Sequence, residues 1–229
     1  MLRLERVAMR YGEGPDVLRH VDLTLKRGEF VFLMGPSGAG KTSLLRLLAV
    51  LHMPSAGRLT LFGEDVRRLD QDRRAALRRR IGMVFQDVRL LDHLSVFDNV
   101  ALPLRVSGRE DQQSARLVSE MLAWFGLGEV AGAKPTTLSM GQRQMVNVAR
   151  AVVTRPDLLL CDEPTAEVDG KLERRLMHLF TRLGKLGTTV VLATHSEDLV
   201  ARYPHPILHV ANGRLSGRAP APARLAAAE

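Results

Sequence analysis

Short apolar runs recur along the chain and alternate with stretches of helical periodicity. The runs are Glu29–Met34, Ile81–Phe85, Leu158–Cys161 and Thr189–Ala193. None of them alternates between apolar and polar residues, so each predicts a strand buried on both faces of a parallel sheet. Between the runs, apolar residues three and four positions apart predict amphipathic helices, as in the segments 118–125 and 172–183. The pattern predicts a layered α/β fold with a mainly parallel core sheet.

The segments outside this core pattern suggest two additions to it. Arg3–Met9 and Val21–Leu25 read as short strands with a turn region near them, which predicts an antiparallel β flap over about residues 1–28. Residues from about 87 to 140 are mostly helical and predict an inserted helical subdomain. We expect one domain over residues 1–215, followed at 216–229 by an Ala/Pro-rich tail that we predict to be disordered.

The chain has 229 residues and a formal net charge of +8, with seven arginines within residues 67–80. A solvated helix face with local ion pairs is the simpler explanation, while anionic lipids or nucleic acid are also attracted by such charge. Arg46 interrupts the best apolar stretch, so no membrane span is predicted, and no signal peptide is recognisable. Cys161 is the only cysteine, which excludes an internal disulfide and fits a reducing cytosol.

The segment Gly35–Thr42 carries the clearest chemistry. It reads G-x-x-x-x-G-K-[ST], directly follows an apolar run and opens a helical pattern. Backbone N–H groups of a glycine loop and a helix N-terminus hold phosphates well, and a chance match in this context is rare. We expect Lys41 to reach the β- and γ-phosphates of ATP, and the hydroxyl of Thr42 to bind Mg²⁺. The predicted loop residues are Gly35, Pro36, Ser37, Gly38, Ala39, Gly40, Lys41, Thr42 and Ser43.

Two adjacent carboxylates, Asp162 and Glu163, end another apolar run and precede Pro164. Such a pair at a turn is usually a solvated loop, but the four apolar residues before it favour a site at the carboxyl edge of the sheet. Asp162 suits Mg²⁺ through a bound water, and Glu163 suits the task of orienting and activating the attacking water. The sequence thus predicts hydrolysis as well as binding.

Three further residues follow or precede the core elements in positions that suit the same site. The amide of Gln86 is placed to contact Mg²⁺ and the attacking water, and His195 to contact the γ-phosphate. Tyr11 is placed to stack on adenine. A structural histidine and an exposed turn tyrosine are the plain alternatives for the last two.

Leu138–Gln142 precedes a helix with one apolar stripe. Ser139 suits a helix N-cap, and the same helix N-terminus suits a second anion site formed with Gly141 and Gln142. Two phosphate-binding elements far apart in sequence suggest a head-to-tail pair of chains. Each ATP would then lie between one loop and the partner copy's Ser139.

Taken together, these motifs resemble the ATP-binding-cassette (ABC) ATPases, from Tyr11 to about Leu215. That resemblance implies a P-loop NTPase with a RecA-like core, ATP and Mg²⁺ as ligands, and an ATP-dependent homodimer. It makes Gln86, Glu163 and His195 catalytic, with Thr42, Gln86 and Asp162 at the metal, and it adds Asp169 as the end of a further nucleotide-contacting loop. No nucleic-acid partner is expected, because this short chain lacks the long insertions of DNA-associated members.

Within the family, the run that follows Gln86 is similar to the cell-division ATPases. This implies a place at the cytoplasmic face of the inner membrane and an integral membrane partner that docks near Asp87–Leu104. ATPases of lipoprotein release or macrolide export are the alternative, and a DNA-associated ATPase or a non-catalytic scaffold is less favoured. Met140, Glu167 and Ser196 depart from the usual family residues, and they put the hydrolysis rate in question more than nucleotide binding.

Overall fold

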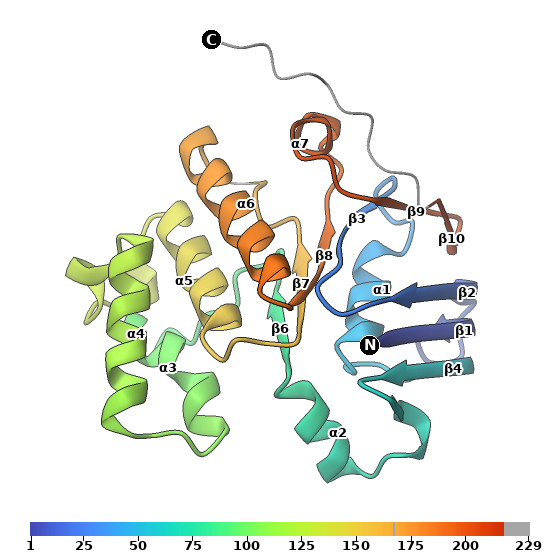
Figure 1. Cartoon of the computed structure of the whole chain (residues 1–229), viewed down its shortest axis with the longest axis horizontal. Coiled ribbons are helices and arrows are strands. Elements are labelled where there is room, and N and C mark those ends of the chain that lie inside the picture. Colours follow the sequence, from blue (N-terminus) through green and yellow to red (C-terminus); the bar gives the residue numbers. More distant parts are fainter. Residues whose placement is uncertain (167, 218–229) are drawn as a thin grey trace.

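Two sheets organise the computed structural model, which describes residues 1–166 and 168–217 (Figure 1). The larger sheet has the strand order β10-β9-β3-β8-β7-β6. Its strands β9, β3, β8, β7 and β6 run parallel, whereas β10 pairs antiparallel with β9. The bounds are β3 Phe30–Met34, β6 Ile81–Val84, β7 Leu158–Asp162, β8 Thr189–Ala193, β9 Ile207–Ala211 and β10 Arg214–Ser216. The four apolar runs coincide with β3, β6, β7 and β8, and the predicted mainly parallel sheet is confirmed.

The second sheet is antiparallel, with the order β2-β1-β4-β5. It consists of β1 (Leu2–Arg10), β2 (Asp16–Leu25), β4 (Ala56–Leu61) and β5 (Glu64–Asp65). It is therefore larger than the two strands expected within residues 1–28. The sequence signal of β4 is weak, because its first three residues are exposed and only Leu59 and Leu61 are buried.

Seven α-helices complete the described chain. They are α1 (Lys41–Leu48), α2 (Gln71–Arg78), α3 (Val96–Val106), α4 (Gln112–Phe125), α5 (Met140–Val152), α6 (Gly170–Lys185) and α7 (Glu197–Arg202). Helices α3 and α4 follow β6 and lie at the opposite end of the molecule from the antiparallel sheet (Figure 1). None of the helices in the described residues has the length and hydropathy needed to cross a membrane. Glu167 and residues 218–229, which hold most of the predicted tail, lie outside the described residues.

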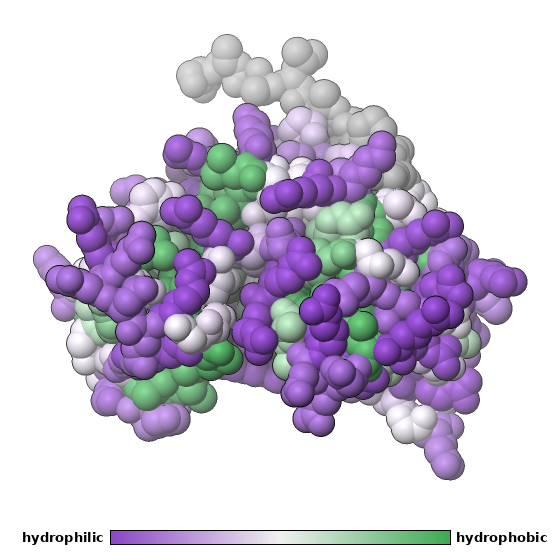
Figure 2. All heavy atoms as spheres, turned by 60° about the horizontal axis from the view of Figure 1, so that its bottom comes forward, coloured by the Kyte–Doolittle hydropathy of each residue, from purple (hydrophilic) through white to green (hydrophobic). Residues whose placement is uncertain are grey.

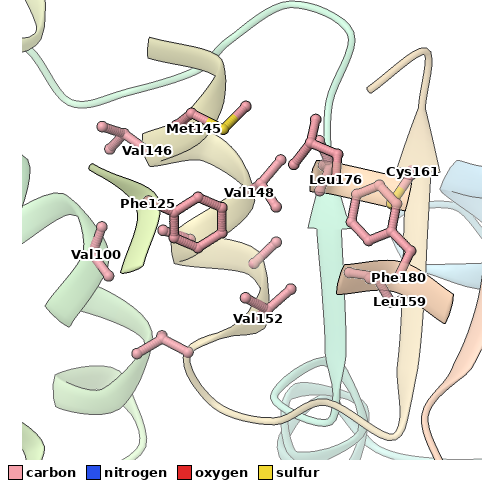
Figure 3. Close-up of a cluster of buried hydrophobic side chains, with 14 of the residues drawn as sticks. Val100, Phe125, Met145, Val146, Val148, Val152, Leu159, Cys161, Leu176 and Phe180 are labelled. Carbon is pink, nitrogen blue, oxygen red and sulfur yellow. The ribbon is translucent and has the colours of Figure 1, made fainter. Parts of the chain in front are cut away.

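The parallel strands are apolar throughout because each face of their sheet carries its own core. In β7, Leu159 and Cys161 pack into a cluster with α3, α4, α5 and α6, part of which is drawn in Figure 3. Leu158 and Leu160 of the same strand pack into a second cluster with α1 and the antiparallel sheet. Burial raises the pKa of the Cys161 thiol well above its ordinary value, and the nearby Asp162 adds to this effect. Cys161 therefore serves as a small core residue.

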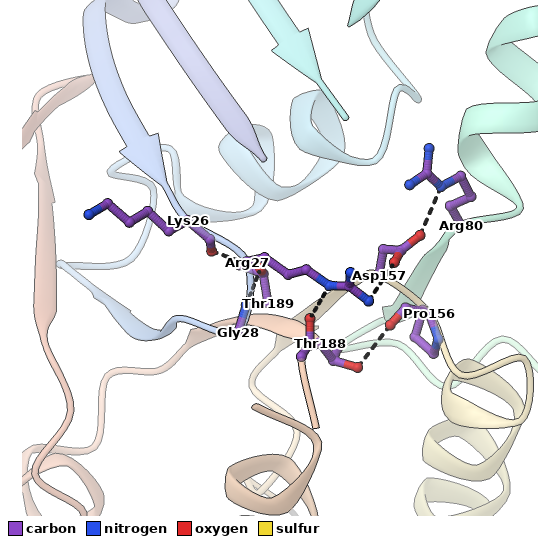
Figure 4. A network of polar contacts seen from close by, with 9 residues as sticks. Lys26, Arg27, Gly28, Arg80, Pro156, Asp157, Thr188 and Thr189 are labelled. Carbon is purple, nitrogen blue, oxygen red and sulfur yellow. Dashed lines mark hydrogen bonds and ion pairs between the residues drawn. The ribbon is translucent and has the colours of Figure 1, made fainter. Parts of the chain in front are cut away.

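A polar network ties together the amino ends of the parallel strands, on the side away from the predicted site (Figure 4). The Thr189 hydroxyl accepts from the Gly28 N–H at 3.1 Å and donates to the Lys26 carbonyl at 3.0 Å. Arg80 forms an ion pair with Asp157 at 2.8 Å. These contacts join the segments at the amino ends of β3, β6, β7 and β8, so they fix where the strands begin. Because the strands are of similar length, the contacts also fix the positions of their carboxyl ends.

The close approach of β6 to the end of α5 generates a stability prediction. A Cβ atom on Gly82 would collide with the carbonyl oxygen of Ala151 and lie 3.0 Å from Pro156 Cγ. Gly82→Ala is therefore expected to lower the free energy of unfolding by about 1–3 kcal/mol, as other overpacked cores do. Urea denaturation followed by circular dichroism measures this difference. Gly132→Ala is the control, since its Cβ meets nothing within 4 Å; equal stability of the two variants would contradict the prediction.

Candidate nucleotide-binding and hydrolysis site

The loop Gly35–Gly40 connects β3 to α1 and has the backbone geometry of an anion cradle. Gly35, Gly38 and Gly40 have φ values of 152°, 76° and 111°, which L side chains rarely adopt. A Cβ on Gly35 would also collide with the carbonyl oxygen of Val210, so glycine is required there. Gly40 is the N-cap of α1 and has no side chain to satisfy the first N–H groups of the helix. Those donors are left for a ligand.

Lys41 folds back over this loop. Its Nζ donates to the carbonyl oxygens of Gly35 at 2.6 Å and of Pro36 at 3.2 Å. Residues 36–38 are exposed at the crest of the loop, whereas Ala39 and Gly40 are buried beneath it. The ammonium group is therefore held against the loop by two backbone carbonyl groups.

The predicted metal ligands Thr42 and Asp162 are in direct contact. The Thr42 hydroxyl donates to Asp162 Oδ2 at 2.7 Å, and Asp162 is 3% exposed at the end of β7. A hydroxyl and a single carboxylate fit Mg²⁺, which takes hard oxygen ligands, often only one or two carboxylates together with substrate phosphates. No cluster of three or more His, Cys, Asp or Glu side chains suited to a metal occurs in residues 1–166 and 168–217. The donor set thus fits a metal held jointly with a polyphosphate.

Glu163 is separated from the metal ligands although it is adjacent in sequence to Asp162. Its Oε1 lies 2.7 Å from Nδ1 of His195, and its N–H donates to the carbonyl of Ala193 at 3.0 Å. Glu163 has a φ of 48°, a left-handed conformation that is strained for a non-glycine residue and is often found at functional sites. The Glu163 side chain is only 9% exposed, whereas that of His195 is 71% exposed. The two residues therefore form a pair with an open histidine and a shielded carboxylate.

Gln86 and Tyr11 make different contacts. Gln86, two residues after β6, lines a cavity of about 270 Å³ together with Glu163 and Met140. Among the described contacts, none joins Gln86 to Thr42 or Asp162. The Tyr11 hydroxyl lies 3.1 Å from Ser43 Oγ, its ring contacts the His52 ring edge to face at 4.9 Å between centroids, and the residue is 39% exposed. Gln86 thus lies with the Glu163 part of the site and Tyr11 beside the first turn of α1.

Ser139 and Gln142 form a reciprocal cap at the N-terminus of α5. The Gln142 N–H donates to Ser139 Oγ at 3.3 Å, and the Ser139 N–H donates to Gln142 Oε1 at 3.0 Å. Met140 beside them is 50% exposed. Asp169 has the same structural role for α6, since its Oδ1 accepts from the Leu172 N–H at 2.8 Å. Within one chain, Ser139 therefore acts as the N-cap of α5, and the N-terminus of that helix is exposed.

Ser196, one of the departures from the family pattern, has a local role. Its Oγ caps α7 by accepting from the Leu199 N–H at 3.1 Å. Met140 extends the surface next to Ser139. Glu167 lies outside the described residues, so its expected effect on hydrolysis stays a prediction.

Two polar residues that the sequence reading missed connect α5 to the site. Gln144 Nε2 donates to the carbonyl of Pro164 at 2.8 Å, and Asn147 Nδ2 donates to the carbonyl of Phe85 at 3.1 Å. Both side chains are buried, and Asn147 also lies 3.3 Å from Gln144 Oε1. They thereby tie α5 to the residues next to Glu163 and Gln86. Their spacing of three residues beside the apolar stripe was the available sequence signal.

Burial of Asp162 generates a prediction about stability and pH. The pKa of Asp162 lies above its ordinary value, first because of burial and secondarily because of Glu163, while the hydrogen bond from Thr42 acts in the opposite direction. A raised pKa means that the carboxylate form destabilises the folded state, so stability falls as the pH rises through the interval between the unfolded and folded pKa values. Asp162→Asn keeps an acceptor for Thr42 and removes the charge. We expect a higher Tm at neutral pH without nucleotide or divalent ions.

Differential scanning calorimetry as a function of pH tests this expectation. The gain in Tm should shrink as the pH falls toward about 4, the ordinary range of an aspartate pKa. Asp92→Asn, at an exposed position, is the control and should not change Tm. A lower Tm for Asp162→Asn at every pH would show that the carboxylate stabilises the fold.

Comparison with known proteins agrees with this geometry. The family model described as ABC transporter matches residues 18–166. The chain is 41% identical over 217 residues to the cell division ATP-binding protein FtsE of Escherichia coli strain K12, covering 95% of this chain and 98% of that protein. FtsE of Mycobacterium tuberculosis is 39% identical, with 94% of each chain covered. The methionine import ATP-binding protein MetN of Xylella fastidiosa is 40% identical over 89% of this chain and 61% of that protein.

Solved structures show the same likeness in three dimensions. A dimeric post-hydrolysis structure of the ATP-binding cassette MJ0796, bound to ADP and Pi, matches with a TM-score of 0.87 and 33% identity, covering 96% of this chain and 99% of that one. A second dimeric structure of MJ0796, a bacterial ABC transporter cassette, matches with a TM-score of 0.88 and 34% identity. Near-complete coverage at this identity means that the likeness extends over the whole domain. The chain therefore belongs to the ABC transporter family of ATPases.

Proposed function

We propose that this chain is the FtsE-like, ATP-hydrolysing subunit of a membrane complex, working with an FtsX-like transmembrane partner in cell division. The observation that carries the proposal is the separation of the two adjacent carboxylates. Asp162 is paired with the P-loop hydroxyl of Thr42, and Glu163 is paired with His195. One carboxylate thus belongs to the metal and the other to the attacking water, which is the arrangement that phosphoryl transfer to water requires.

Different residues of the chain have different roles in ATP hydrolysis in this proposal. The open N–H groups of α1 and the ammonium of Lys41 bind the phosphates, and Tyr11 holds the adenine. Thr42 and Asp162 would hold Mg²⁺, which would supply positive charge to the phosphates. Glu163 orients a water for in-line attack and accepts its proton, while His195 keeps the Glu163 carboxylate in place and faces the γ-phosphate from the exposed side. Gln86 reaches the same water through the cavity that it shares with Glu163.

Closure of two copies around ATP completes the site in this proposal. The exposed α5 N-terminus, with Ser139 as its cap, is a second anion-binding element, and the described contacts do not join it to the P-loop of its own chain. Dimeric structures of the related cassette MJ0796 support a symmetric pair. Contacts that exist only in the closed pair give ATP the differential affinity that shifts the equilibrium toward closure.

A groove beside α3 is the proposed docking site of the membrane partner. It has a volume of about 610 Å³ and lies between β6 with α2 and the helices α3 and α5. The groove is lined by three residues of the expected docking range Asp87–Leu104, namely Arg89, Leu102 and Pro103. Val96 and Val100 of the same range are buried in the core. It also extends to residues before and after that range, including Phe85 and Val106. The docking surface is thus formed by both the core and the helical segment.

Import of a small molecule is the second candidate, favoured by the likeness to MetN. It uses the same ATP chemistry and differs in the membrane partner. Purification of the chain from membranes in mild detergent, with identification of the bound protein, distinguishes the two. A division-type partner supports the proposal and an importer permease contradicts it.

The role of Glu163 predicts a specific phenotype. Glu163→Gln keeps the size and hydrogen-bonding capacity of the side chain but cannot accept a proton, so phosphate release should fall by roughly 10²- to 10⁴-fold. ATP binding should be retained, and the dimer should accumulate because its contacts are no longer removed. Phosphate release and light scattering with Mg²⁺-ATP measure both effects. Glu120→Gln on the exposed face of α4 is the control; unchanged turnover in Glu163→Gln would refute the assigned role.

The composite site predicts complementation between two inactive variants. Ser139→Asp preserves a good N-cap but adds negative charge where the partner copy's γ-phosphate must bind, and Ser139→Asn keeps the cap without that charge. We expect Ser139→Asp and Lys41→Ala each to be inactive alone, and their mixture to recover part of the ATPase activity through mixed dimers. Ser139→Asn should remain active. A mixture no more active than its components would contradict a site shared between two copies.

A further inference from the structure

The groove between α2, β6, α3 and α5 is both apolar and strongly basic. Met83, Leu102, Pro103 and Val106 contribute apolar surface, and Val106 is 65% exposed. Among the described residues, four arginines and no acidic residue line the groove; the arginines are Arg78, Arg79, Arg89 and Arg150. Figure 2 shows the underside of the molecule in Figure 1, where apolar areas lie between long hydrophilic side chains.

Of the four arginines in the groove, Arg150 is the one whose charge most requires a carboxylate partner. It extends from α5, is half-buried, and its guanidinium contacts Asn147 Oδ1 at 3.4 Å. No carboxylate lies within ion-pair distance of Arg150 in residues 1–166 and 168–217. Burial lowers its pKa, because the charged form loses hydration there. Covering this side chain with an uncharged surface would leave a buried charge without compensation, which is costly.

The three other arginines surround the groove without strong ion pairs of their own. Arg78 donates to the carbonyl of Val50 at 3.4 Å, and Arg79 has no ion pair in the described part of the chain. Arg89 is 5.1 Å from the centre of the Phe85 ring and has one long, exposed ion pair with Asp87 at 4.0 Å. By contrast, Arg73 and Arg80, outside the groove, have carboxylate partners at 2.7 and 2.8 Å. Positive charge without a close carboxylate partner among the described residues therefore faces the groove.

We propose that the groove receives an acidic amphipathic segment of the membrane partner, with apolar side chains against Leu102 and Val106 and at least one carboxylate on Arg150. This inference rests on the proposed function and adds the chemistry of the docking segment. A guanidinium binds a carboxylate through two parallel hydrogen bonds, which orients the segment as well as holding it. A flat lipid surface matches these features less well, because it meets exposed arginines and does not reach a half-buried one between apolar walls.

The binding of the co-purified membrane protein, reconstituted in nanodiscs, tests the inference. Arg150→Gln should weaken its affinity for the ATPase subunit by roughly 30-fold or more, the usual effect of removing one member of a buried charge pair. Arg150→Lys should retain part of the affinity. Arg78→Gln and Arg79→Gln, at exposed positions that do not endanger folding, should each weaken binding less and reduce its dependence on salt. Arg116→Gln, an exposed arginine of α4, is the matched control.

A charge exchange identifies the carboxylate. Each acidic residue in the cytoplasmic segments of the partner is changed to lysine and paired with Arg150→Glu. One pair should restore binding that both single variants lose. Nucleotide binding and Tm of the isolated ATPase variants should match the wild type, which shows that the site and the fold are intact.

Val106→Asp separates failure of this inference from failure of the docking proposal. If Val106→Asp abolishes binding and the arginine variants do not, the groove is the docking site and the acidic segment is refuted. If neither kind of variant affects binding, the docking proposal fails together with the inference. If the arginine variants lose binding to phosphatidylglycerol vesicles and keep binding to the partner, the arginines serve lipid and the inference is overturned.

Discussion

Burial of β3, β7 and β8 on both faces confines the polar chemistry of these strands to the residues at and after their carboxyl ends. The strands are parallel and adjacent in the sheet, so those ends meet at one edge. The P-loop follows β3, Asp162 is the last residue of β7 with Glu163 directly after it, and His195 follows β8. The antiparallel sheet and the helical segment cover the two faces of the parallel sheet. This packing holds the carboxyl ends of the strands in fixed positions relative to one another. The site is a direct consequence of the way the core is packed.

The carboxylates of Asp162 and Glu163 have different environments because β7 ends between them. Asp162 is the last residue of β7 and remains buried, where its charge is disfavoured and its oxygen accepts from Thr42. Glu163 is the first residue beyond the strand, and its left-handed backbone turns its side chain toward His195. Packing of the surrounding core offsets the unfavourable free energy of the buried Asp162 charge and of the left-handed Glu163 backbone. A cation held by Asp162 and Thr42 would offset this unfavourable buried charge, and its binding would then stabilise the folded state.

The sequence predicted the parallel strands well because they depend on local pattern and order, and the structure brings the predicted site residues together in two contacts, Thr42 with Asp162 and Glu163 with His195. Apolar runs that end in Gly35 or in Asp162 and Glu163 specify a buried strand and the chemistry that follows it. The antiparallel sheet was underestimated, because β4 pairs through its backbone and has few buried side chains to reveal it. Gln144 and Asn147 escaped prediction for another reason. Their three-residue spacing indicates that they share a helix face, but their partners are the backbone carbonyl groups of Pro164 and Phe85, which a sequence cannot identify.

Helix α5 joins features that lie far apart on the surface. Its exposed N-terminus has Ser139 as the cap, its middle is bonded through Gln144 and Asn147 to the segments that hold Glu163 and Gln86, and Arg150 near its end faces the groove. Asn147 contacts Arg150 directly, so one continuous chain of side-chain contacts runs from the groove to Pro164. A helix whose buried polar groups are satisfied only in one position moves as a unit rather than by gradual bending. In the proposed complex, this chain of contacts is the route through α5 by which an occupied groove and the ATP site shared between two copies would influence each other.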